Sequence, residues 1–158
     1  ITWNALISGF SQLGKAEEVF NLFECMNIEG VKPDEATFAG VLKACSHGGD
    51  IDKGHRYFES MDKSYGITPG LSHHTCMVDL LGRAGQLTKA GEMMDNVPFH
   101  PDSVMSLALL SACRKWSDID LGAYVFQHAI GSDEKLTSAY VCMYNMYTDA
   151  IMDKVMTC

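Results

Sequence analysis

Hydrophobic side chains recur along this chain at helical spacing, in sets that are separated by glycine. Residues that are three, four and seven positions apart lie on one face of an α-helix, so each set predicts an amphipathic helix. Gly14 separates the first two sets, and Gly30 and Pro33 follow the second, because glycine accepts left-handed dihedral angles and proline cannot continue a helix. Residues 1–34 are therefore predicted to form a helix-turn-helix hairpin. The two sets are Trp3, Leu6, Ile7 and Phe10, and Val19, Leu22, Phe23 and Met26.

The same pattern returns at regular intervals along the rest of the chain. Segment 3–26 reappears in degenerate form at 38–61 and 74–97, and the equivalent positions are 35, 36, 32 and 34 residues apart. Units of this length with two helical halves are typical of solenoids, because one unit cannot bury its apolar face alone. The sequence predicts an all-α, right-handed solenoid of helix-turn-helix hairpins, with four hairpins plus a partial fifth. The equivalent positions are Trp3, Phe38, His74, Ser106 and Tyr140. One continuous core is expected from Leu6, Ile7, Leu22, Val41, Leu42, Phe58, Val78, Leu81, Leu109 and Leu110.

Composition agrees with a helical protein that has a continuous core. The 158 residues are 47% hydrophobic and 20% charged. No apolar run approaches the roughly 20 residues that a membrane span needs. The chain starts at Ile1, inside a repeat, so we interpret it as a fragment or a mature C-terminal portion without a transit peptide.

The six cysteines are predicted to be free thiols with structural roles. They are never closer than 16 residues, so no C-x-x-C pair is present to hold a metal ion. Cys45 and Cys113 fall at the same repeat position on the apolar face of a first helix, where a thiol acts as a small hydrophobic group. A reducing compartment follows from this interpretation.

The sequence gives no indication of an enzyme, a metal site or a cofactor. His73 and His74 are adjacent, so on a helix they point about 100° apart and cannot chelate one ion as an i, i+4 pair could. A nucleophile elbow, a phosphate-binding glycine loop and a paired-carboxylate motif are all absent from the sequence. We therefore expect no catalytic activity, no cofactor and no metal.

Four strings of residues resemble the pentatricopeptide-repeat (PPR) proteins of land plants, and more narrowly the C-terminal end of their PLS class. They are TWNALISG (2–9), GVKPDEATFAGVLKACSHGG (30–49), CMVDLLGRAG (76–85) and ALLSACR (108–114). The resemblance covers the whole chain. It implies a PPR array over 1–102 and an E-motif region over 103–158. The array divides into a P-like motif (1–34), an L-like motif (35–70) and an S-like motif (71–102), and the E region into a first motif (103–136) and a truncated second one (137–158).

The resemblance implies that the array reads single-stranded RNA, one base per repeat. In the family, the fifth and last residues of a motif select the base, and the second residue packs against its face. In the P-like motif these selecting residues are Asn4 and Asp34, a pair that resembles the uridine code. Ile1 and Ala36 would enclose this base between two short apolar groups.

The next two motifs extend the expected recognition element. In the S-like motif Thr75 and Asp102 resemble the guanosine code, whereas Ala39 and Gly70 of the L-like motif carry no side-chain hydrogen-bonding group and should read nothing. Because the array runs parallel to RNA in the family, the expected element is U-N-G in the 5′ to 3′ sense.

Each of these polar residues also has a purely structural interpretation. Asn4 and Thr75 fit capping or solvated positions, and Asp34 and Asp102 fit N-caps of the helices that follow them. At the two aspartates we expect both roles. The net charge of −8 opposes the general attraction between a protein and phosphate groups, so this segment alone should bind RNA weakly.

The E-like region indicates protein partners in place of bases. In the family these motifs connect the array to a deaminase domain or to editing cofactor proteins, which implies that the parent factor recognises sites of cytidine-to-uridine RNA editing in an organelle. Either the mitochondrion or the chloroplast fits, with the mitochondrion slightly preferred. The chain lacks the H-x-E and C-x-x-C zinc signature of a deaminase, so a deaminase would have to come from other sequence.

This region departs from the family pattern, and one alternative function stays open. The first E motif usually has an aromatic residue at Ser106 and a glycine at Leu107, and residues 151–158 lack the expected glycine and tryptophan. The half-helix at 151–158 is expected to be too short to close a hairpin. The alternative function is a helical-repeat scaffold for protein interactions in an organellar complex, without base readout.

Overall fold

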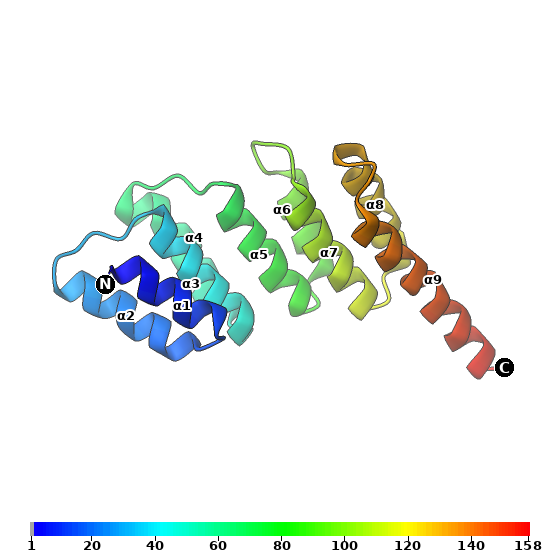
Figure 1. Cartoon of the computed structure of the whole chain (residues 1–158), viewed down its shortest axis with the longest axis horizontal. Coiled ribbons are helices and arrows are strands. Elements are labelled where there is room, and N and C mark those ends of the chain that lie inside the picture. Colours follow the sequence, from blue (N-terminus) through cyan, green and yellow to red (C-terminus); the bar gives the residue numbers. More distant parts are fainter. Residues whose placement is uncertain (1) are drawn as a thin grey trace.

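The computed structural model describes residues 2–158, and within them every regular element is an α-helix (Figure 1). The helices form four antiparallel hairpins followed by one long single helix, so the predicted all-α solenoid is confirmed. The helices are α1 (Trp3–Gln12), α2 (Ala16–Ile28), α3 (Glu35–Gly48), α4 (Ile51–Tyr65), α5 (Leu71–Arg83), α6 (Leu87–Asp95), α7 (Ser103–Lys115), α8 (Ile119–Ser132) and α9 (Thr137–Met156).

The first helices of successive hairpins stack side by side. Helix α1 packs on α3, α3 on α5, α5 on α7 and α7 on α9, while α2, α4, α6 and α8 each pack on the first helix of their own hairpin. We call the surface formed by α1, α3, α5, α7 and α9 the inner face. It runs the length of the array, as expected of a solenoid in which each unit contacts its neighbours.

The turn inside each hairpin needs a residue with a left-handed backbone. Gly14, Gly49 and Gly85 take this role in the first three hairpins, with φ angles of 70°, 68° and 78°. Ser117 takes it in the fourth with φ 58°, and within the described residues it is the only residue other than glycine with a positive φ. A side chain in this region costs about 1 kcal/mol or more, so the fourth turn is the most strained of the four.

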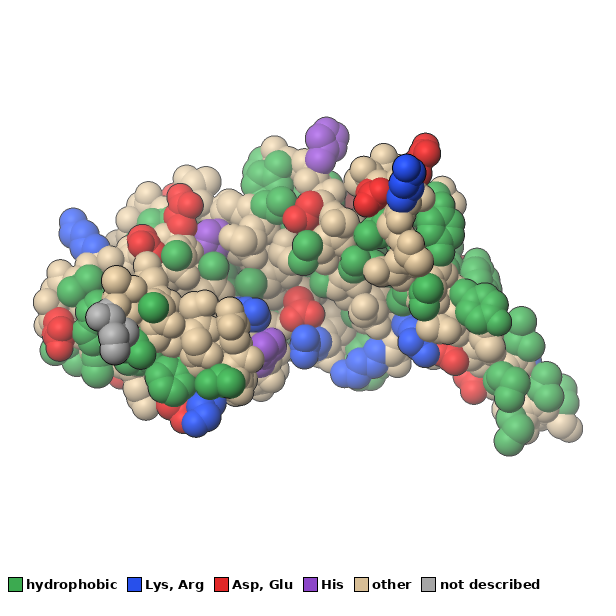
Figure 2. Space-filling model, in the orientation of Figure 1, with side chains coloured by type: hydrophobic (Ala, Val, Ile, Leu, Met, Phe, Trp, Pro, Cys, Tyr) green, Lys and Arg blue, Asp and Glu red, His purple; other side chains and the backbone are tan. Residues whose placement is uncertain are grey.

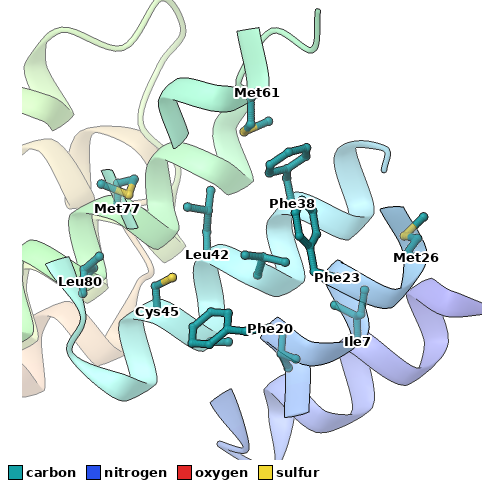
Figure 3. Packing of buried hydrophobic residues seen from close by; sticks show 13 residues of the cluster. Ile7, Phe20, Phe23, Met26, Phe38, Leu42, Cys45, Met61, Met77 and Leu80 are labelled. Atoms are coloured by element: carbon teal, nitrogen blue, oxygen red, sulfur yellow. The ribbon is translucent and has the colours of Figure 1, made fainter. Parts of the chain in front are cut away.

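Within residues 2–158 the buried core residues fall into two clusters, and the half-buried Ile51 and Met93 pack against both. The first lies among α1 to α5 (Figure 3), and the second extends from α5 to α9. Helix α5 supplies both, with Met77 and Leu80 in the first cluster and Val78 and Leu81 in the second. Of the ten predicted core positions, seven are buried. The three that are only half-buried are Leu6, Leu22 and Phe58.

Helix α9 is the partial fifth hairpin, but it lacks the separate half-helix expected at 151–158. Its 20 residues form one uninterrupted helix, so residues 151–156 extend the first helix of the unit and do not begin another. Tyr144 of α9 stands at the repeat position of Leu42, which is buried, yet its own side chain is 71% exposed. Apolar side chains gather at this end of the molecule (Figure 2). The exposed large ones on α9 are Tyr140, Val141, Tyr144, Tyr147, Ile151, Met152, Val155 and Met156.

The cysteines lie as the repeat phase indicates. All six are free thiols in the described part of the chain, and Cys45 and Cys113 are buried at equivalent positions in α3 and α7. Burial raises the pKa of each of these two thiols to about 12, so both are protonated and unreactive at neutral pH. In residues 2–158 no three His, Cys, Asp or Glu side chains come close enough to hold a metal ion. None of the helices there has both the length and the hydrophobicity of a membrane span.

Candidate nucleic-acid interface

Three hollows follow one another along the inner face. The first, of about 380 Å³, lies among α1, α3 and α5, and the second, of about 680 Å³, among α3, α5 and α7. The third, of about 740 Å³, lies between α7 and α9. One repeat position lines all of them, so each first helix turns the same side toward the hollows. The residues at that position are Ser8, Lys43, Asp79, Ser111 and Asn145.

Asn4 and Asp34 meet beside the first hollow. Asn4 lies in the first turn of α1 and Asp34 is the N-cap of α3, and the stacking of these two helices brings the side chains together. The amide Nδ2 of Asn4 donates to both carboxylate oxygens of Asp34, each at 3.0 Å. The two residues that the uridine code pairs are therefore in direct contact.

Thr37 completes this cluster. Its hydroxyl donates to Oδ1 of Asn4 at 2.6 Å, and its backbone N–H donates to Oδ1 of Asp34 at 2.9 Å. The backbone N–H of Asp34 in turn donates to the Thr37 hydroxyl at 3.1 Å, which forms a capping box at the start of α3. Asn4 is thus held at both ends of its amide, so its orientation is fixed before any ligand binds.

The same contacts keep the Asp34 carboxylate charged. The backbone N–H of Thr37 is the main reason that the pKa of Asp34 lies below its usual value, and partial burial opposes it; the Thr37 hydroxyl and the Asn4 amide lower the pKa further. A charged acceptor binds the Asn4 amide more strongly than a neutral one would.

Loss of this carboxylate is expected to destabilise the protein in a pH-dependent way. Asp34→Ala should lower the free energy of unfolding by about 1 kcal/mol at neutral pH, the usual value of an N-cap. Since the folded-state pKa is depressed, the contribution is present above the unfolded pKa and is lost as pH falls through the folded one. Urea unfolding at a series of pH values should show the gap between wild type and variant closing below about pH 4. Asp62→Ala on α4 is the control, and a gap that is independent of pH would contradict the assignment.

Ala36 is one of the two apolar residues expected to enclose the first base. Ala36 is exposed and lines the first hollow together with Asn4 and Ala39. Ile1 lies outside the described residues. Ala36 is therefore on the correct surface for a contact with a base held near Asn4.

Thr75 and Asp102 line the second hollow together but do not touch each other. The Thr75 hydroxyl donates to the carbonyl oxygen of Leu71 at 2.9 Å, and Oδ1 of Asp102 accepts from the backbone N–H of Met105 at 2.9 Å. In the described structure no hydrogen bond joins the two side chains. Asp102 is thus an N-cap, as its alternative interpretation predicted, and the second pair is less preorganised than the first.

The L-like motif lies between these two pairs. Its code positions, Ala39 and Gly70, carry no side-chain hydrogen-bonding group. Ala39 is half-buried on the wall of the first hollow. Gly70 is the N-cap of α5, and its backbone N–H donates to Nδ1 of His73 at 3.0 Å. The Nε2 of this buried ring lies 2.8 Å from the carbonyl oxygen of Glu35, so His73 joins the starts of α3 and α5.

Several residues of the candidate interface were not predicted from the sequence. Thr37 is one, although the D-x-x-T spacing of a capping box after Pro33 could have indicated it. The cations of the inner face are the others. Lys and Arg side chains are spread across the region from α3 to α9, with acidic side chains among them (Figure 2). Those that line the hollows are Lys43, Arg83, Arg114 and Lys115.

These cations change the interpretation of the net charge. Lys43 lines both the first and the second hollow, and Arg83 of the second forms an ion pair with Asp79 at 2.9 Å. The net charge of −8 therefore does not describe the inner face, because the hollows are lined by four cations and by only three carboxylates, Asp79, Asp102 and Asp149. Such groups are what a surface that follows a nucleic-acid backbone requires.

A stacked array of helical hairpins with polar side chains on its inner face defines the chain as a helical-repeat protein with a ligand-binding surface. Comparison with known proteins gives the family. The model of the PPR repeat family matches residues 1–47, and a second PPR repeat model matches residues 36–65. The chain carries pentatricopeptide repeats.

Its relatives are much longer than the chain itself. A pentatricopeptide repeat-containing protein of Arabidopsis thaliana is 44% identical over 149 residues, which cover 94% of this chain and 21% of the relative. Another from the same plant, named as mitochondrial, is 39% identical over 158 residues, or 100% of this chain and 28% of the relative. A third, named as chloroplastic, is 39% identical over 149 residues, or 94% of this chain and 20% of the relative.

Solved structures share the fold. The pentatricopeptide repeat protein PPR10 in complex with an 18-nt psaJ RNA element superposes with a TM-score of 0.78 at 13% identity, covering 94% of this chain and 22% of that one. The PPR domain of Arabidopsis thaliana protein-only RNase P 1, in complex with tRNA, gives 0.69 at 21% identity, covering 92% of this chain and 79% of that one. The similarity confirms the solenoid architecture.

Proposed function

We propose that this chain is a single-stranded RNA-binding segment. It reads bases with side chains near the N-terminal ends of the helices that form the inner face. The observation that carries the proposal is the cluster of Asn4, Asp34 and Thr37 at the edge of the first hollow. An amide held in one orientation by a carboxylate and a hydroxyl presents a fixed hydrogen-bonding pattern, which is what selection of one base requires. The RNA ligands named for PPR10 and for the RNase P domain support the same class of ligand.

The chemistry of uracil fits the first site. Oδ1 of Asn4 has two lone pairs and accepts one hydrogen bond from Thr37, so one lone pair remains for the N3–H of uracil. Cytosine carries no proton at that nitrogen, which gives a reason for discrimination between the two pyrimidines. Ala36 on the wall of the hollow would pack against the face of the base.

The second site would read guanosine with Thr75 and Asp102. Because the Thr75 hydroxyl donates to Leu71, its oxygen is left as an acceptor that faces the second hollow, suited to an N–H donor of guanine. Asp102 uses one oxygen as a helix cap and retains the other for a second donor or a bridging water. With Ala39 and Gly70 reading nothing between them, the element is U-N-G.

The wider assignment rests on the resemblance to the PLS class. We propose that residues 1–102 are the P, L and S motifs of an organellar editing factor and that 103–158 is its E region. Under this assignment the parent factor recognises sites of cytidine-to-uridine editing in a mitochondrion or a chloroplast. Its partners are a deaminase domain or editing cofactor proteins. The relatives named as mitochondrial and chloroplastic support an organelle but leave both open.

The test of the RNA-binding proposal is a comparison of RNAs that differ at single positions. Residues 1–158 should be joined to additional upstream repeats, since two reading repeats on an acidic chain bind weakly. Changing U to A or G to A in the U-N-G element should weaken binding by about 5-fold or more, the equivalent of about 1 kcal/mol per base contact. Changing the middle base should have no effect. Equal affinity for all of these RNAs would favour the scaffold function.

A further inference from the structure

The third hollow lies outside the residues that the repeat models match, yet it has the composition of a binding site for a charged, polar ligand. Helix α7 contributes Ser111, Arg114 and Lys115 near its C-terminal end, and α9 contributes Asn145 and Asp149. Ser111 and Asn145 stand at the repeat position that also lines the first two hollows. The inner face therefore continues past the predicted reading motifs and into the E-like region.

The two cations of this hollow keep hydrogen-bonding capacity. Arg114 forms an ion pair with Asp149 through Nε at 3.2 Å, and its guanidinium carries four further N–H donors. Nζ of Lys115 donates to the carbonyl oxygen of Arg83 at 3.1 Å and has two more donors. Lys115 is also held over the ring of Trp116, 5.0 Å from its centre. The ammonium group thus lies between α5 and α7, and Lys115 also lines the third hollow.

We propose that the third hollow is a further nucleotide subsite, in which Arg114 and Lys115 bind a phosphate of single-stranded RNA and Asn145 with Ser111 contacts the same nucleotide. This inference rests on the proposed RNA-binding function. An arginine matches phosphate through paired N–H groups, and an asparagine amide can donate to and accept from a base edge or a ribose hydroxyl. The subsite would hold nucleotides that follow the U-N-G element on its 3′ side, since that is the side nearer α7.

Asp149 competes with a phosphate for the guanidinium of Arg114, so changing Asp149 gives the sharpest test of the proposal. The carboxylate occupies Arg114 in the free protein, but both side chains are about half exposed, with exposed fractions of 44% and 56%. An exposed ion pair of this kind contributes little to stability, so a phosphate can replace Asp149 at the guanidinium. Removing the charge of Asp149 should therefore strengthen binding, whereas removing that of Arg114 should weaken it.

The experiment is an NMR titration of the 158-residue chain at low salt, where millimolar affinities are measurable. The RNA probes are the trinucleotide UAG and the hexanucleotide UAGAAA. With the hexanucleotide, the side-chain signals of Arg114 and Asn145 should shift and binding should be about 3-fold to 10-fold tighter than for the trinucleotide. Arg114→Gln should abolish that gain and reduce the salt slope of binding by about 0.7, the value for one phosphate contact with a single strand. Asp149→Asn should increase the gain.

Lys63→Gln is the matched control, because Lys63 is also an exposed cation in an ion pair, with Glu59 on α4, but lies outside the hollow. It should leave the hexanucleotide gain unchanged. Equal loss in both variants would overturn the proposal in favour of general charge attraction. Equal binding of both RNAs, or tighter binding of an acidic hexapeptide at Arg114, would also overturn it. Base discrimination at U and G reports separately on the proposed function, so the two can fail independently.

Discussion

Leu42→Asp is expected to lower the free energy of unfolding by about 4 kcal/mol, because it places a charge without a partner in the core. Leu42 is 1% exposed, in the middle of α3. That helix packs against α1, α2, α4 and α5, so the damage extends to three hairpins. Figure 3 shows the side chain among the residues of the first core cluster. Urea unfolding followed by circular dichroism would measure the effect.

The matched control is the same substitution at an exposed leucine. Leu13 is the C-cap residue that follows α1 and is 72% exposed, so Leu13→Asp should change stability by no more than about 0.5 kcal/mol. Similar losses in the two variants would mean that α3 does not lie in the core of the array.

The helices were predictable from sequence because their apolar periodicity, glycines and prolines agree. The division of the core was not, since it depends on how α5 turns between its neighbours. Met77 and Leu80 lie toward the first cluster and Val78 and Leu81 toward the second. The periodicity predicted burial of Val78 and Leu81, but it does not say against which helix a side chain of α5 packs.

At the C-terminal end of the array, the single helix α9 agrees with a partial fifth hairpin, but the separate half-helix expected at 151–158 does not form. Between Thr137 and Met156 no glycine or proline is present to stop a helix, so the backbone continues for 20 residues. The tyrosines at positions that are buried elsewhere remain exposed on α9. Helix length here follows local propensity, whereas burial depends on the neighbours that each side chain meets.

The candidate site was predictable only in part. The resemblance to PPR proteins indicated Asn4 and Asp34, and the structure brings the two side chains together. Thr37 belongs to the same cluster through a capping box that spans two repeats, and a pairwise code does not include such a third residue. The cations on the inner face could not be predicted from the net charge, because the net charge sums over all faces of the chain.

The largest expected functional effect is a change of base preference on Asn4→Thr. The amide donates to both oxygens of Asp34 and accepts from Thr37, whereas a threonine hydroxyl has a single proton and cannot donate to both oxygens. Threonine with aspartate is also the combination that we propose reads guanosine in the S-like motif. Preference at this nucleotide should therefore shift from uridine to guanosine by about 1–3 kcal/mol, or roughly 5-fold to 150-fold in affinity. Asn21→Thr, an exposed asparagine on α2, is the control and should change nothing.

The most direct test of RNA reading is one set of dissociation constants. Wild type and Asn4→Thr, each joined to upstream repeats, should be titrated with four RNAs that differ only at the nucleotide facing Asn4. Wild type is predicted to bind the uridine RNA most tightly and the variant the guanosine RNA, with preferences at every other position unchanged. Equal binding of all four RNAs by both proteins would contradict base readout by this array.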